Sequence, residues 1–191
     1  MPRRQSKKAA PARKRPESTA ELRKAMSRRR KEELLDALLE LAQADRGVLR
    51  QLTARFDVAA APAELVAATR QAIVDATDFD ERDINHNFAY DYEAYSEVKR
   101  NLGRLIDAGQ LRLTMQLALE LMKQGSHQVE MSDEGMMTED IEDCLSVVLK
   151  ALKKCDLSAA EIASWCSAMR KNDRVGFIAR EHLQSLAAAA R

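Results

Sequence analysis

The sequence predicts an all-α fold of stacked antiparallel helical hairpins, an α-solenoid-like repeat bundle of about eight helices. Helix-forming residues dominate the composition, whereas the 191 residues include only six glycines and four prolines, which disfavours turn-rich β folds. Apolar residues recur at steps of three and four from residue 34 onward, as they do along one face of a helix. The connections between these segments are short, so neighbouring helices are expected to run antiparallel.

The first expected helix runs from about residue 19 to residue 43. Ser18 and Glu21 have the spacing of a capping box at its start. Its second half carries an apolar stripe that we expect to be buried, formed by Leu34, Leu35, Leu38, Leu39, Leu41 and Ala42. Asp45 can cap a short second helix, with these residues inside: Val48, Leu49, Leu52 and Phe56.

A third helix is expected from Pro62, which suits a first helical position, to about Thr77. The fourth ends before Gly109, where a left-handed residue is expected, and its buried stripe is predicted to hold Tyr92, Tyr95, Val98, Leu102, Leu105 and Ile106. The fifth runs from Gln110 to about Gln124 and is apolar on most sides, which indicates a central position. Gly125 to Gly135 is predicted to be a loop.

The last three expected helices close the bundle. The sixth has clean apolar spacing between Met137 and Cys155. Ser158 and Glu161 repeat the capping-box pattern before the seventh, which would bury Ile162, Trp165, Cys166 and Met169. The eighth is marked by Phe177, Ile178, Leu183 and Leu186. The cysteines Cys144, Cys155 and Cys166 are expected to act as small apolar side chains.

The net charge of +1 conceals a strong asymmetry. Residues 1–31 carry thirteen Lys or Arg against two Glu, a net charge of +11, and the remainder carries 18 basic and 28 acidic residues, a net charge of −10. Residues 1–17 are predicted to form a disordered basic arm, and residues 18–191 a single helical domain. Dense basic charge suits nonspecific contact with phosphates, for which the candidates are Arg3, Arg4, Lys7, Lys8, Arg13, Lys14, Arg15, Arg28, Arg29 and Arg30.

Three cysteines and the lack of a hydrophobic signal segment favour a reducing, cytoplasmic environment. No apolar run approaches the roughly 20 residues that cross a bilayer, so no membrane association is expected. No phosphate-binding loop, nucleophile elbow or His-Glu-x-x-His pattern occurs. We therefore expect neither a cofactor nor enzymatic activity.

Residues 78–95 gather all three tyrosines, six carboxylates and His86. The carboxylates could serve Ca²⁺, but their spacing lacks the glycine and glutamate of an EF-hand loop. His86 beside Asp83 could act as a general base, although no nucleophile accompanies it. We interpret the stretch as an acidic connection whose aspartates cap the next helix, and we name Asp83, His86 and Tyr90 as candidate partner-binding residues.

Three segments resemble a known protein region: LLELAQADRGVLRQLTARF, LVAATRQAIVDAT, and FAYDYEAYSEVKRNLGRLIDAGQLRLTMQLALELMKQG with the following SDEG turn. Together they are similar to the helical region that accompanies SWIM-type zinc fingers in bacterial proteins, over roughly residues 34–186. The finger itself requires Cys-x-Cys and Cys-x-His pairs for its zinc ion, and neither occurs here. The resemblance therefore implies a repeat-like interaction scaffold without a zinc site.

These observations favour a non-enzymatic scaffold that binds a protein partner, with the basic arm adding nonspecific contact to nucleic acid. Two alternatives remain open at this stage. The first is a nucleic-acid-associated factor that relies on the arm and on the basic face of residues 23–31. The second is an enzyme built around Asp83, His86 and Tyr90. Oligomeric state and partner identity are not encoded in any pattern that we find.

Overall fold

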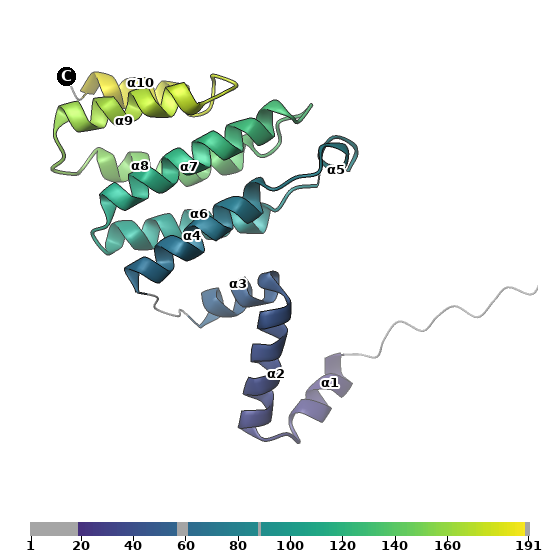
Figure 1. The fold of residues 1–191 in the computed structure, drawn as a ribbon. Coiled ribbons are helices and arrows are strands. Elements are labelled where there is room, and N and C mark those ends of the chain that lie inside the picture. The colour runs from purple at the N-terminus through teal and green to yellow at the C-terminus, as the bar shows by residue number, and fades with distance from the viewer. Residues whose placement is uncertain (1–18, 57–60, 88, 190–191) are drawn as a thin grey trace, which may run out of the picture. The chain divides into compact units, whose positions relative to one another are not determined.

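A computed structural model describes residues 19–56, 61–87 and 89–189, except the side chains of Ala20 and Ala54. These residues form helices and no strand, which confirms the all-α prediction. Ten helices follow one another along the described chain (Figure 1): α1 Thr19–Met26, α2 Lys31–Ala44, α3 Arg46–Arg55, α4 Pro62–Thr77, α5 Glu81–His86, α6 Tyr92–Asp107, α7 Leu111–Glu130, α8 Thr138–Leu152, α9 Ala159–Asn172 and α10 Arg180–Ala189.

The chain divides into two compact units, Met1–Phe56 and Asp57–Arg191. We call them the amino-terminal unit, which holds α1 to α3, and the carboxy-terminal unit, which holds α4 to α10. The predicted arm at residues 1–17 and the cap at Ser18 lie outside the described residues. The single domain expected over residues 18–191 stays a prediction.

The helix predicted over residues 19–43 is wrong in one respect, because it is broken at residues 27–30 into α1 and α2. The Ser27 hydroxyl donates a hydrogen bond to the Lys24 carbonyl at 3.0 Å, which competes with continued helix. A new start follows at once, since Glu33 accepts from the Arg30 backbone N–H at 3.0 Å. A local capping contact of this kind is a helix-start signal.

The leucine stripe of α2 is more exposed than predicted. Within the described residues of the amino-terminal unit only Ala42 is buried, while Leu35, Leu39 and Leu41 are about half exposed. Leu49 and Phe56 are likewise exposed. The physical reason is that the ten-residue α3 is the helix that packs against α2, and it is too short to cover the stripe. Asp45 caps α3 as predicted, accepting from the backbone N–H groups of Gly47 and Val48.

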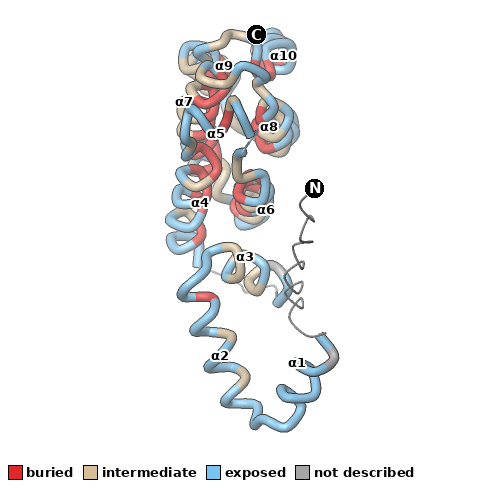
Figure 2. Tube along the Cα trace, turned by 90° about the vertical axis from the view of Figure 1, so that its right-hand side faces the viewer, coloured by how far each residue is buried: buried red, intermediate tan, exposed pale blue. Residues whose placement is uncertain are grey.

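The carboxy-terminal unit consists of three stacked helical hairpins, α4–α6, α7–α8 and α9–α10, as predicted. Helices α4, α7 and α9 form one layer and α6, α8 and α10 form the other, as Figure 2 shows end-on. Local signals set several of the boundaries. Pro62 opens α4, the Ser158 hydroxyl accepts from the Glu161 N–H at the start of α9, and Gly109 has a left-handed φ of 72° after α6.

The first layer repeats with a nearly constant period. Its helices begin at residues 62, 111 and 159, so the starts are 49 and then 48 residues apart. Buried side chains follow the same offsets, in the sets Leu65, Thr114 and Ile162; Thr69, Ala118 and Cys166; and Ala72, Leu121 and Met169. Each hairpin therefore offers the same face to its neighbour, as in other solenoid repeats.

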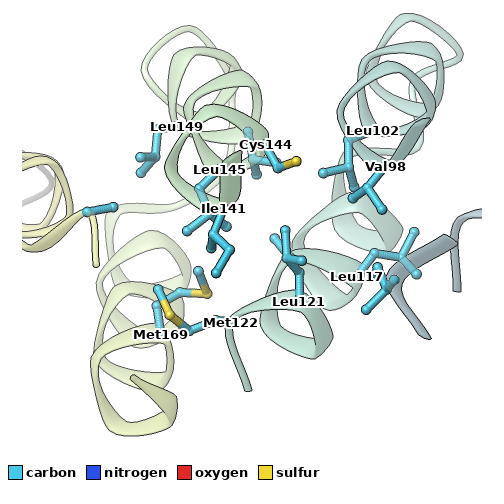
Figure 3. Close-up of a cluster of buried hydrophobic side chains, with 14 of the residues drawn as sticks. Val98, Leu102, Leu117, Leu121, Met122, Ile141, Cys144, Leu145, Leu149 and Met169 are labelled. Carbon is cyan, nitrogen blue, oxygen red and sulfur yellow. The ribbon is translucent and has the colours of Figure 1, made fainter. Parts of the chain in front are cut away.

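One continuous core fills the space between the layers (Figure 3). Cys144 and Cys166 are buried in it, as predicted for apolar-like thiols. The Cys144 thiol donates to the Tyr95 carbonyl at 3.2 Å, and burial raises the pKa of this thiol to about 12. At the second junction between hairpins, the Trp165 indole N–H donates to the Met115 carbonyl at 2.9 Å.

Helix α7 extends beyond its predicted end at Gln124 to Glu130, so the loop predicted from Gly125 is wrong in its first half. At Gly125 an added Cβ would lie 2.8 Å from Cδ1 of Ile141, so glycine permits close packing against α8. Two polar residues that follow, Ser126 and Gln128, are buried and hydrogen-bonded. Ser126 donates to the Asn172 carbonyl at 2.9 Å, and the Gln128 amide donates to the Ala76 carbonyl at 3.1 Å.

Ion pairs connect neighbouring helices in the layer formed by α4, α7 and α9. Arg70 binds Glu120 at 3.0 Å between α4 and α7, and Arg112 binds Glu161 at 2.9 Å between α7 and α9. The hydrogen bond from Arg112 lowers the pKa of Glu161 below its usual value. In the last hairpin, α10 begins at Arg180, after the predicted marker Phe177, which is exposed. None of the described helices is long and apolar enough to span a bilayer.

Candidate functional site

An open pocket of about 670 Å³ lies in the carboxy-terminal unit where α4 ends, α5 begins and α6 starts. Two short chain segments, 78–83 and 89–93, form its wall. Its lining combines five carboxylates with three aromatic rings. We call it the acid-aromatic pocket, and define it by Asp78, Phe79, Asp80, Asp83, Ala89, Tyr90, Asp91, Tyr92 and Glu93.

Two of the carboxylates shape the pocket by capping helices. Oδ1 of Asp80 accepts from the backbone N–H groups of Arg82 at 2.9 Å and Asp83 at 3.0 Å, which starts α5. Asp91 accepts from the Ala94 N–H at 2.9 Å, which starts α6. A capping aspartate satisfies backbone donors that would otherwise lack a partner. The predicted capping role of the aspartates is therefore confirmed.

Helix α5 is held in place by the side chain of Asn85. Its amide N–H donates to the Met131 carbonyl at 3.1 Å, and its amide oxygen accepts from the Asp133 N–H at 2.9 Å. Both partners lie in the connection between α7 and α8. Beside Asn85, Ile84 is buried in the core. The predicted acidic connection therefore contains a short helix, α5, and is attached to the next hairpin.

Tyr90 is also fixed by the next hairpin. Its hydroxyl donates to Oδ2 of Asp140 at 2.9 Å, and its ring meets that of Tyr95 edge-on at 6.3 Å between centroids. Partial burial, then the bond to Asp140, raises the pKa of Tyr90 to about 12. Tyr90, which we named as a candidate partner-binding residue, is half-buried. Tyr92, predicted to be buried, is 61% exposed, because the buried stripe of α6 starts at Ala94.

Next to Tyr90, buried polar groups of three helices form a chain of hydrogen bonds. The Tyr95 hydroxyl donates to Oε1 of Gln128 at 2.5 Å, and the Gln128 amide continues to the Ala76 carbonyl in α4. Phe79, which also lines the pocket, packs edge-on against His127 with centroids 5.9 Å apart. The aromatic walls are therefore held by contacts with α7 and α8, which sequence periodicity cannot show.

The structure brings together two of the three predicted partner-binding residues. Asp83 and Tyr90 line the acid-aromatic pocket, whereas His86 is exposed at the end of α5 and is not part of its lining. Oδ1 of Asp83 accepts from the Asn87 amide at 3.2 Å. Among the residues that the structure describes, no three His, Cys, Asp or Glu side chains are grouped so that they could hold a metal ion.

Three of the ten predicted nucleic-acid contacts fall on described residues. Arg28, Arg29 and Arg30 are exposed in the turn between α1 and α2, and Arg30 pairs with Glu33 at 3.5 Å. The other seven lie outside the described part of the chain: Arg3, Arg4, Lys7, Lys8, Arg13, Lys14 and Arg15.

Comparison with protein-family models, with curated proteins and with solved structures gives no match for this chain. The resemblance to the helical region of SWIM-associated proteins therefore stays a prediction.

Proposed function

We propose that the chain is a non-enzymatic helical-repeat scaffold that binds a protein partner at the acid-aromatic pocket. The observation that carries this proposal is an accessible pocket whose walls are fixed by the side chains of Asn85 in α5 and Asp140 in α8. Rigid walls bind at a lower entropic cost than a loop that must be ordered first. Exposed Tyr92 at the rim is the kind of side chain that dominates binding energy at interfaces.

The basic residues add nonspecific contact with nucleic acid in this proposal. Arg28, Arg29 and Arg30 are consecutive and exposed, and they continue the basic arm along the chain. Neutralising phosphates with such residues gives salt-sensitive binding with little sequence preference. The second candidate function, a nucleic-acid-associated factor, rests on the same residues and makes them the main source of affinity.

The test uses the full chain in partner capture, comparing wild type with Tyr92→Ala. Phe177→Ala is the matched control, since Phe177 is another exposed aromatic residue, 52% against 61% for Tyr92, on the last hairpin. We expect specific partners to be lost with the first variant and kept with the second. Equal recovery by both variants would refute partner binding at this pocket.

A second full-chain variant separates the two candidate functions. Replacing Arg28, Arg29 and Arg30 by Gln should reduce the slope of log affinity for duplex DNA against log salt by up to about three, because each lost phosphate contact removes about 0.9. Partner capture should be unchanged. If the triple variant abolishes partner capture as well, the nucleic-acid-associated factor becomes the better account.

A further inference from the structure

The charge of the acid-aromatic pocket indicates what it binds. Five lining residues are carboxylates, Asp78, Asp80, Asp83, Asp91 and Glu93, and no Lys, Arg or His is among the lining residues that the structure describes. Negative charge extends behind the wall, since Asp140 accepts the Tyr90 hydroxyl and Glu139 precedes it in α8. Both carboxylates also contribute to raising the pKa of Tyr90. A concave surface lined by one sign of charge attracts ligands of the other sign.

The aromatic residues further restrict the chemical class of the ligand. Phe79, Tyr90 and Tyr92 line the same pocket as the carboxylates. An aromatic face attracts a Lys ammonium or an Arg guanidinium through its quadrupole, and the adjoining ring surface accommodates the apolar stem of either side chain. A hydrated metal ion would gain little from such rings, because Ca²⁺ and Mg²⁺ bind through oxygen ligands.

The caps leave the carboxylates able to accept further hydrogen bonds. The cap at α5 uses Oδ1 of Asp80, and an ionised carboxylate has about four acceptor sites on its two oxygens. Asp78 follows the last residue of α4 and Glu93 lies in the first turn of α6, and both are exposed. Five carboxylates exceed what a single cation can neutralise, so the occupant is expected to carry several positive charges.

We propose that the acid-aromatic pocket binds a basic segment of a partner protein and takes one Arg or Lys side chain between its rings. This proposal rests on the proposed function and names the chemistry of the partner. The volume of the acid-aromatic pocket, about 670 Å³, lies within the roughly 300–1,000 Å³ of typical ligand sites. It is enough for a long side chain with part of its backbone.

The experiment measures binding of a labelled, short Arg-containing peptide to the full chain by fluorescence anisotropy, at low and at physiological salt. The comparison peptide carries citrulline, which keeps the shape of Arg without its charge. We expect the double variant Asp78→Asn with Glu93→Gln to weaken binding of the Arg peptide about tenfold at low salt, from two screened charge contacts. Tyr92→Ala should weaken it about fivefold.

Two control variants match these substitutions: one removes a carboxylate charge away from the pocket, and the other removes an aromatic ring away from it. Asp107→Asn lies at the opposite end of α6 from Glu93, roughly 20 Å away at 1.5 Å per residue, and Phe177→Ala removes an exposed ring on the last hairpin. Both should bind the Arg peptide like wild type. Equal weakening by Asp107→Asn would mean nonspecific attraction, and equal binding of the citrulline peptide would mean that charge is not recognised. Either result overturns the proposal.

Further outcomes distinguish failure of the proposed ligand from failure of the proposed function. If neither peptide binds while Tyr92→Ala still abolishes partner capture, the basic ligand is wrong and the proposed function stands. If spermine binds more tightly than the Arg peptide and responds to the same variants, the ligand is a free polyamine, which overturns the protein segment. Circular dichroism of every variant checks that loss of binding is not loss of fold.

Discussion

Replacing Gly125 by Ala is expected to destabilise the protein, although alanine is the better helix former. Within a helix, Gly to Ala contributes about 1 kcal/mol of stability. Against this gain, the new Cβ would lie 2.8 Å from Cδ1 and 3.1 Å from Cγ1 of Ile141, which is fully buried in α8. Overpacking a core costs roughly 1–3 kcal/mol. We therefore expect a net loss of about 1 kcal/mol in the free energy of unfolding.

Gly103→Ala is the matched control, because this glycine also lies inside a helix. Its added Cβ would meet Cγ1 of Val147 at 3.9 Å, an ordinary contact. This variant should be stabilised by about 0.5–1 kcal/mol, so the two substitutions have opposite signs in urea unfolding followed by circular dichroism. Adding Ile141→Val, which removes Cδ1, should restore part of the loss at Gly125. Equal stabilisation by both alanines would refute close packing of α7 on α8.

Three further predictions concern single side chains. Tyr90→Phe should lower the free energy of unfolding by about 1 kcal/mol at neutral pH through one lost hydrogen bond. Because the pKa of Tyr90 is raised from 10.0 to about 12 on folding, its contribution is complete below pH 10 and lost as the pH rises to 12, so alkaline unfolding of the variant should be less steep there. Asn85→Ala removes both bonds between α5 and the connection that follows α7, and should speed amide hydrogen exchange in α5; unchanged exchange would contradict its anchoring role. Arg112→Gln should make stability less sensitive to acid, because the pKa of Glu161 is lowered on folding and its contribution is lost as the pH falls below 4.5; parallel acid-unfolding curves would count against this ion pair.

The sequence predicted those helix boundaries that depend on residues at the boundary itself. Pro62 opens α4 and Gly109 follows α6, and both act within a few residues of their own position. The end of α7 could not be predicted in this way. Ser126 and Gln128 look like loop residues, but they are buried and donate to the carbonyls of Asn172 and Ala76, which lie on other helices. Whether a polar residue is buried depends on such distant partners.

The site was predictable only in part, for the same reason. Composition singled out residues 78–95, and two of the three candidates named there, Asp83 and Tyr90, line the pocket; their role in partner binding stays a prediction. The phase of the helical pattern placed Tyr92 inside, because it lies three residues before buried Tyr95, but the first turn of a helix is covered only when another element reaches it. The burial of the leucines of α2 was overestimated for the same reason. An apolar stripe shows which face of a helix favours burial, but not whether another element covers that face.

The single tryptophan of the chain lies at the junction between the second and third hairpins, with its indole bonded to the Met115 carbonyl. The protein therefore contains a built-in optical reporter for separation of its last hairpin alone. Fluorescence that changes at a lower urea concentration than the overall helical signal would reveal a stack that peels from its carboxy-terminal end. Superimposed curves would instead identify the three hairpins as one cooperative block.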